Sequence, residues 1–147
     1  EIGFLWSVGV VAEIIMFAFA HVFLTRFSWR YLVSLCLVLT GIRWMIVGLL
    51  PNSFMAQFLA QTIHAFSFGL FHMIAMRVVF QNFSIGQQGR GQAMYSTMWG
   101  LGVALGSILA GRYWQLISGE VIFIIAGFAT FIGLLFVRWL PKHIQQA

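Results

Sequence analysis

The sequence predicts an all-α fold, a polytopic bundle of about five transmembrane helices, and two observations lead to it. Of the 147 residues, 61% are hydrophobic and only 7% are charged, with a mean hydropathy of +0.95. A soluble domain carries roughly a quarter charged residues because its surface meets water. The hydrophobic residues also occur in long runs, and a membrane-spanning helix needs about 20 of them. The surface of this chain is therefore expected to face lipid.

The apolar runs define the expected spans in chain order. They lie at about 4–23, 31–50, 54–79, 92–114 and 121–140. Short polar segments separate them at 25–30, 51–53, 83–91 and 115–120, and these loops are too short to hold a second domain. The third run is the longest, so its helix is expected to tilt or to protrude from the bilayer. Strands are not expected, because membrane strands alternate apolar and polar residues.

The basic residues predict the orientation, since cytoplasmic loops of membrane proteins are enriched in Lys and Arg. If the spans alternate, one side holds Arg26, Arg30, Arg77, Arg90, Arg138 and Lys142. Arg112 lies near the other side, with Glu1 and Glu120. We therefore expect a multi-pass protein of the cell (inner) membrane that starts outside and has a cytoplasmic C-terminus. The net charge of +5 then matches anionic lipid headgroups, and no nucleic-acid partner is expected.

Three ionisable residues fall inside the expected spans, where such groups are costly and suggest function. At 1.5 Å per residue, Glu13 lies about 15 Å, Arg43 about 18 Å and His64 about 22 Å from the cytoplasmic ends of their helices. The three are expected to meet near the middle of the membrane if their faces converge. Because a lone charge is hard to tolerate there, we expect Glu13 to pair with Arg43.

Helical periodicity places further residues beside these groups. Trp6 and Gly9 share a stripe with Glu13 on the first helix. On the third helix one stripe contains Gln57, Gln61, His64, Phe68 and His72. A row of amides and imidazoles through an apolar helix is what a water-accessible path requires. A structural interpretation stays open: a Glu13–Arg43 pair can hold two helices in register, and the imidazoles can be buried hydrogen-bonding partners.

The fourth run contains a ridge of small residues. Gly102, Gly106 and Ala110 share one face, which allows another helix to approach closely. Tyr95 and Trp99 continue that face toward the cytoplasm. We expect the three small residues to serve helix packing and Trp99 to be available for stacking on an aromatic ring.

The whole pattern resembles the major facilitator superfamily, specifically the second half of a twelve-helix secondary transporter. The resemblance is carried by segments 4–13 (FLWSVGVVAE), 41–44 (GIRW), 61–64 (QTIH), 89–96 (GRGQAMYS) and 106–111 (GSILAG). They are similar to the branch of proton symporters that includes lactose permease and the phenylpropionate permeases. The resemblance implies that residues 1–147 are a partial C-terminal half, the eighth to twelfth helices of the family's inverted three-helix repeats.

The resemblance also implies roles for three residues. Glu13, Arg43 and His64 match the glutamate, arginine and histidine that lactose permease uses for sugar binding and proton coupling. That permease has a glutamate three residues after the histidine, whereas this sequence has Ser67. Proton coupling is therefore expected to use another carboxyl group, and Glu13 is the membrane-embedded candidate. The same departure weakens the case for a sugar as the substrate.

We therefore expect secondary active transport of a small organic solute, such as an aromatic acid, by alternating access with proton-coupled symport. The predicted substrate-binding or proton-coupling residues are Glu13, Arg43, His64, Gln61, Trp6 and Trp99. The expected partners are the solute, protons, the lipid bilayer and a missing N-terminal half of the same transporter. Neither enzymatic activity nor a cofactor or metal is expected.

Two alternatives stay open. One is a membrane scaffold or assembly subunit without transport, although such a protein has little reason to keep buried charges. The other is a histidine-ligated membrane redox protein, which would need paired ligands at matched depth. The sequence has no HExxH motif and no aspartate, so it offers little support for metal chemistry.

Overall fold

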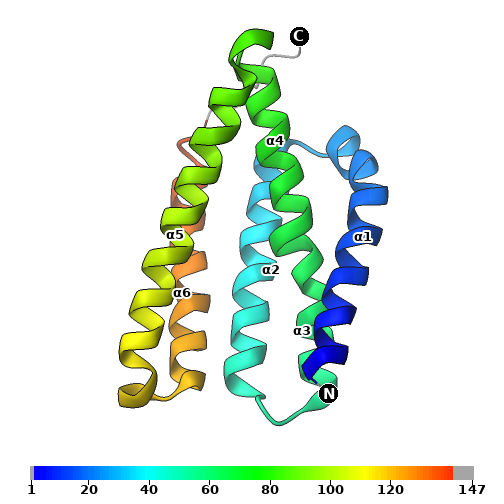
Figure 1. The fold of residues 1–147 in the computed structure, drawn as a ribbon. Helices are drawn as coiled ribbons and strands as arrows, with labels where there is room; N and C mark the ends of the chain where they lie inside the picture. Colours follow the sequence, from blue (N-terminus) through cyan, green and yellow to red (C-terminus); the bar gives the residue numbers. More distant parts are fainter. Residues whose placement is uncertain (1, 141–147) are drawn as a thin grey trace.

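The computed structural model describes residues 2–140, and within them the chain is helical with no strand. The elements in Figure 1 are α1 (Ile2–Arg26), α2 (Trp29–Leu49), α3 (Phe54–His64), η1 (Ala65–Leu70), α4 (Phe71–Asn82), η2 (Ile85–Gln87), α5 (Gln88–Ile117) and α6 (Gly119–Val137). The predicted all-α fold is confirmed. Glu1 and Lys142, on which part of the predicted orientation rests, lie outside the described residues.

Five segments of the described residues are long and apolar enough to cross a membrane, which makes this a multi-pass membrane protein. They are Ile2–Arg26, Trp29–Leu49, Phe54–Asn82, Ile85–Ile117 and Gly119–Val137. The third span joins α3, η1 and α4, and the fourth joins η2 and α5. Most predicted boundaries are short by a few residues because helical hydrogen bonding continues into the polar interfacial layer, beyond the apolar run.

Two serines explain where α2 and α3 begin. The Ser28 hydroxyl accepts a hydrogen bond from the Tyr31 N–H at 3.4 Å, and the Ser53 hydroxyl accepts one from the Ala56 N–H at 3.3 Å. Such capping side chains satisfy backbone N–H groups that have no helical partner. Because the linkers at these points are only a few residues long, consecutive helices run in opposite directions.

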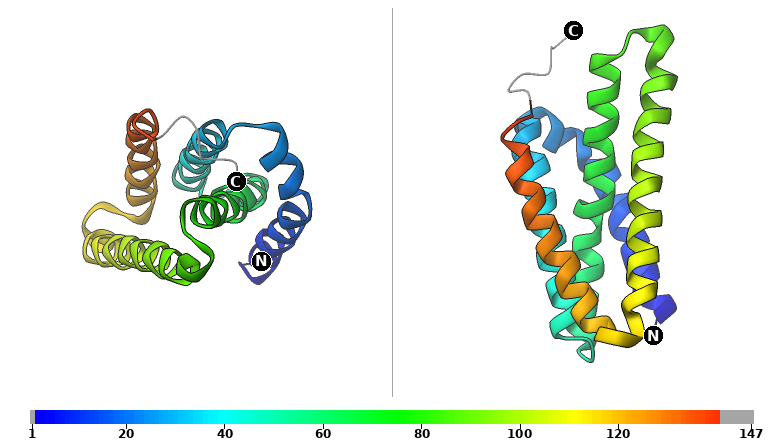
Figure 2. Two further views of the ribbon diagram at one scale, coloured as in Figure 1. Left: turned by 90° about the horizontal axis from the view of Figure 1, so that it is seen from above. Right: turned by 90° about the vertical axis from the view of Figure 1, so that its left-hand side faces the viewer.

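Figures 1 and 2 show the third span lying between α1 and α5, with α2 running beside α6. Glycines bring α2 and α6 close together. A Cβ atom on Gly48 would lie 2.7 Å from the Glu120 carbonyl oxygen, and one on Gly41 would lie 2.6 Å from the Phe131 ring. From the other side, a Cβ atom on Gly127 would lie 3.1 Å from the Gly41 carbonyl oxygen. Helices in lipid associate through small residues of this kind.

The third span changes its winding directly after His64. Residues 65–70 form η1, a π-helical turn, in which hydrogen bonds join residues five apart instead of four and which occurs often at functional sites. A Cβ atom on Gly69 would lie 3.5 Å from Met16, so η1 packs against α1. The buried core forms where α1, α2, η1 and α4 meet, from Met16, Leu32, Cys36, Ala65, Leu70 and Ile74.

The helix α5 is largely uncovered by the rest of the described chain. Ile108 is 65% exposed, and a Cβ atom on Gly102 or Gly106 would meet nothing within 4 Å. Ala110, the third residue of the ridge, is partly exposed. No helix in residues 2–140 packs on this ridge, so the predicted packing role of Gly102, Gly106 and Ala110 stays a prediction.

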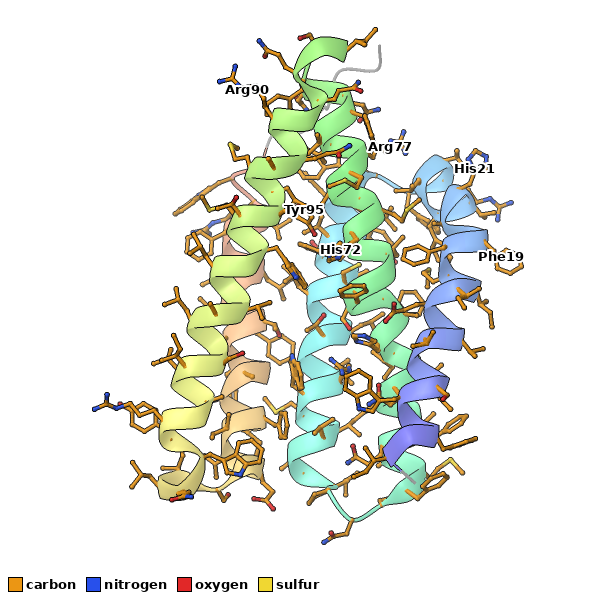
Figure 3. The ribbon with its side chains drawn as sticks, in the orientation of Figure 1. Phe19, His21, His72, Arg77, Arg90 and Tyr95 are labelled. Atoms are coloured by element: carbon orange, nitrogen blue, oxygen red, sulfur yellow. The ribbon has the colours of Figure 1, made fainter. Side chains whose placement is uncertain are left out.

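Five arginines gather at one end of the bundle, which we call the basic end. They are Arg26, Arg30, Arg77, Arg90 and Arg138, of which Figure 3 labels Arg77 and Arg90. Arg77 donates a hydrogen bond to the Leu24 carbonyl, and Arg30 donates to the carbonyls of Arg138 and Leu140. These guanidinium groups thus satisfy carbonyls near the ends of α1 and α6, which lack helical partners.

Candidate functional site

Five of the predicted site residues line one pocket between α1, α2 and α3. The pocket has a volume of about 210 Å³ and is lined by Trp6, Gly9, Val10, Glu13, Arg43, Gln61 and His64. We call it the charged pocket. The sixth predicted residue, Trp99, does not line it. The expected convergence of an acid, a guanidinium and an imidazole from three separate helices is thus seen in the structure.

Gly9 allows α3 to bring its polar side chains against α1. A Cβ atom on Gly9 would lie 3.1 Å from the Gln61 side-chain oxygen and 3.7 Å from the His64 ring. Glu13 follows four residues later, which puts it on the same face of α1 one turn further on. The absence of a side chain at Gly9 therefore leaves room for Gln61 and His64 to face the carboxylate.

Glu13 pairs with His64. Its Oε1 lies 2.8 Å from the His64 Nε2, and the two side chains are 17% and 27% exposed. The predicted pairing was with Arg43, and the structure differs because depth along a helix fixes height but not direction. One proton joins the two atoms, so either the imidazole N–H donates to the carboxylate or a protonated carboxyl group donates to the imidazole.

Arg43 is left without a carboxylate partner. Among residues 2–140 no carboxylate forms an ion pair with it, and its buried Nε has no hydrogen-bond partner there. Its guanidinium carbon lies 4.4 Å from the centre of the Trp44 ring, a cation–π contact. Buried charges are normally paired, and a guanidinium binds carboxylates through two parallel hydrogen bonds. The charged pocket can therefore accept an anion at Arg43.

Trp44 belongs to a stack of rings that supports Arg43, although it is not among the predicted site residues. The Trp44 ring stacks on Phe123 of α6 at 5.3 Å with an angle of 12° between the planes. Phe123 in turn meets Trp114 of α5 edge to face at 6.0 Å. A tryptophan directly after an arginine inside a span was the available signal, since such rings attract guanidinium groups.

A group of ring side chains lies between the third span and α5. We call it the aromatic cluster: Phe68, His72, Tyr95 and Trp99. The His72 ring centre lies 4.4 Å from Phe68, 4.6 Å from Trp99 and 5.4 Å from Tyr95. Figure 3 shows His72 and Tyr95 side by side between α4 and α5. Trp99 is therefore placed beside His72 rather than beside Glu13.

The two groups meet at Phe68. Its ring stacks on His64 of the charged pocket at 5.6 Å and lies tilted against His72 at 4.4 Å. His64, Phe68 and His72 are spaced four residues apart across this π-helical turn, so their rings follow one another along one side of the third span. Phe68 thus stands between the two imidazoles, and in residues 2–140 no group of three or more His, Cys, Asp or Glu side chains is arranged to hold a metal.

A larger cavity of about 480 Å³ lies between α1 and the third span, toward the basic end. Its lining includes Met16, Phe23 and Phe66, and the residues around it are almost entirely apolar. Phe19, also part of the lining, points away from the bundle in Figure 3. Such a cavity suits hydrocarbon but offers little to orient a polar solute. The smaller charged pocket is therefore the better candidate site.

Comparison with known proteins gives a family and a relative. The model of the MFS_1 like family matches residues 1–125. The chain is also 31% identical, over 130 residues, to a protein of Escherichia coli (strain K12) named "Probable 3-phenylpropionic acid transporter". The match covers 85% of this chain and 33% of that protein, so the chain spans about a third of its relative's length. No solved structure matches.

Proposed function

The chain belongs to the MFS_1 like family of the major facilitator superfamily, and we propose that it forms part of a secondary transporter for a small organic acid. In this proposal residues 1–147 are a partial C-terminal half that works with an N-terminal half, as the inverted repeats of such transporters require. The protein is then a transporter rather than an enzyme and needs no cofactor. It lies in the inner membrane with the basic end in the cytoplasm.

One observation carries the proposed substrate class. Glu13 pairs with His64, whereas Arg43 lines the same pocket and has no carboxylate partner in residues 2–140. An organic acid can supply that partner, with its carboxylate on the guanidinium. Trp6 lines the pocket and is 70% exposed, so it offers a ring face to the rest of the solute. The name of the Escherichia coli relative, "Probable 3-phenylpropionic acid transporter", agrees with this chemistry.

The same pocket supports proton coupling. A carboxyl group and an imidazole 2.8 Å apart can share or release one proton, and the charge of the pair changes when they do so. Because Arg43 lines the same pocket, that change alters how strongly the pocket attracts an anion. We infer that protonation of the Glu13–His64 pair favours binding of the acid. Alternating access then carries the proton and the acid across together.

The test uses the full-length transporter that contains this chain, purified and reconstituted in liposomes. We expect a pH gradient, acid outside, to drive uptake of 3-phenylpropionate faster than its passive entry into protein-free liposomes, and a protonophore to abolish accumulation above the external concentration. An Arg43→Gln variant is expected to lose about 10- to 100-fold in the rate at low substrate, because it loses a charge-assisted hydrogen bond. Initial rates of uptake of the labelled acid measure this loss.

The matched control is Arg90→Gln, which removes an arginine at the basic end, outside the charged pocket. It should transport at the wild-type rate. The uncharged 3-phenylpropionamide should compete poorly in the wild type and as well as the acid in Arg43→Gln. An Arg43→Gln protein that keeps the wild-type rate and the preference for the acid would contradict the anion site. Accumulation that survives the protonophore would contradict proton coupling.

A further inference from the structure

His72 stands beyond the charged pocket, on the side of the basic end. It follows His64 by eight residues of the third span, which corresponds to about 12 Å along the helix. The path from the charged pocket toward the basic end along this face therefore passes Phe68 and then His72. Ser67, which lies between the imidazoles in sequence, donates its hydroxyl proton to the His64 carbonyl at 3.1 Å and does not titrate.

The two imidazoles present complementary nitrogen atoms. In His64, Nε2 contacts Glu13, while Nδ1 is buried and has no hydrogen-bond partner in residues 2–140. In His72, Nδ1 lies 3.1 Å from the Phe68 carbonyl oxygen, which accepts only, so Nδ1 carries the hydrogen. The Nε2 of His72 is then the lone-pair nitrogen of the neutral ring. His64 can thus release a proton at Nδ1, and His72 can take one at Nε2.

Tyr95 adds a third polar atom to this region. Its hydroxyl oxygen is buried and has no hydrogen-bond partner among the described residues, and its ring lies 5.4 Å from that of His72. Buried polar atoms nearly always have a partner, which can be ordered water. The Tyr95 hydroxyl and the His64 Nδ1 therefore each need a further partner, and we expect ordered water beside Phe68 and His72 to supply it.

The other titratable groups around His72 do not compete for this role. From α5 the group in contact with it is Tyr95. On α2, Cys36 is buried in the apolar core, and Arg43 lines the charged pocket. On α1, Glu13 is paired with His64, and His21 points out of the bundle in Figure 3. On α4 itself, Arg77 is bonded to the Leu24 carbonyl.

We propose that His72 is a second proton-carrying residue of the transporter, which takes the proton from the Glu13–His64 pair and passes it toward the basic end. The proposal rests on the proposed function, because it concerns the coupling proton of that transporter. Glu13 transfers its proton to the His64 Nε2, and His64 releases its Nδ1 proton through water to the His72 Nε2. His72 then gives that Nε2 proton to water at the basic end and returns to neutral. No electron is transferred.

The test separates steps that move a net proton from steps that do not. In liposomes containing the full-length transporter, accumulation of labelled 3-phenylpropionate under a pH gradient, beyond the passive accumulation in protein-free liposomes, requires proton release at every turnover. Exchange of labelled for unlabelled acid at equal pH on both sides does not require it. We expect His72→Gln to reduce accumulation and the accompanying acidification of the lumen, followed with a trapped pH dye, at least tenfold. Its rate of exchange should stay within twofold of the wild type.

Two further variants keep the test decisive if His72→Gln folds poorly. Tyr95→Phe keeps the ring and removes the hydroxyl, so it should reduce accumulation about threefold and leave exchange unchanged. His21→Gln removes an imidazole that points out of the bundle, and it should behave as the wild type. Gel filtration in detergent confirms that each variant is folded.

The outcomes distinguish this proposal from the proposed function. A wild type that does not accumulate the acid in a proton-dependent way would overturn the proposed function and, with it, the role of His72. A coupled wild type together with normal accumulation in His72→Gln would overturn the role of His72 alone. Equal loss of accumulation and exchange in a folded His72→Gln protein would also overturn it, because His72 would then act in binding or packing.

Discussion

Two helix interfaces of this chain depend on glycine, yet they differ in what the glycine approaches. At the α2–α6 interface, Gly48 lies against the backbone of α6. A Cβ atom added to Gly48 would lie 2.7 Å from the Glu120 carbonyl oxygen. At the α1–α3 interface, Gly9 lies against the ends of polar side chains. A Cβ atom added to Gly9 would lie 3.1 Å from the Gln61 side-chain oxygen. The first interface holds two backbones together in lipid. The second leaves room for the residues of the charged pocket.

The difference separates the framework of the bundle from its candidate site. A backbone cannot move aside without shifting a whole helix, whereas the end of a side chain can rotate away at small cost. Added volume at Gly48 should therefore be felt as lost stability, and added volume at Gly9 as altered binding. Gly102 on α5 is a third case, because no described residue lies within 4 Å of its Cβ position.

The largest effect is expected for Gly48→Ala. The new methyl group would lie 2.7 Å from the Glu120 carbonyl oxygen, 2.9 Å from the Ile124 side chain and 3.2 Å from the Ile124 backbone nitrogen. Overpacking of this kind costs roughly 1–3 kcal/mol, and a backbone neighbour favours the upper part of that range. The full-length variant should unfold at a clearly lower temperature in detergent, as measured by intrinsic fluorescence. An unchanged unfolding temperature would mean that α2 and α6 are not held this closely.

An intermediate effect is expected for Gly102→Leu, which tests whether α5 has a partner outside this chain. The ridge of Gly102, Gly106 and Ala110 is predicted to serve helix packing. A large side chain would block close approach, at a cost of about 1–2 kcal/mol, in the lower part of the range for overpacking. Gly102→Ala keeps a small residue and is the control, expected to be neutral. If Gly102→Leu is equally stable in the full-length protein, α5 faces lipid or water at this position.

Much of the fold could be predicted from sequence because the lipid environment restricts what a chain can do. Backbone groups in a bilayer must pair within a helix, so each apolar run becomes one helix and the short linkers fix the alternation. The same restriction made Glu13, Arg43 and His64 conspicuous, and counting residues placed them at similar depth. These inferences needed no knowledge of which helices touch.

The arrangement inside the site could not be predicted, because it depends on direction around each helix and on local winding. Glu13 reaches His64 rather than Arg43 since Gly9 brings α3 against that face of α1. The π-helical turn after His64 packs against α1, and the sequence gives no periodic signal for its winding. Trp99 was grouped with the pocket by residue type, whereas contacts between α5 and the third span place it beside His72.

The smallest effect on stability, and the most informative one for the site, is expected for Gly9→Ala. Its methyl group would lie 3.1 Å from the Gln61 oxygen, so the amide must move by a few tenths of an ångström while the backbone stays in place. The unfolding temperature should not change measurably. Under the proposed function, the KM for 3-phenylpropionate should rise by up to about fivefold, a change worth less than about 1 kcal/mol, because Gln61 shares the pocket with Arg43. If Gly9→Ala instead unfolds as early as Gly48→Ala, the α1–α3 contact belongs to the framework as much as α2–α6 does. The charged pocket would then be a product of tight helix packing, rather than a site with room for its own side chains to adjust.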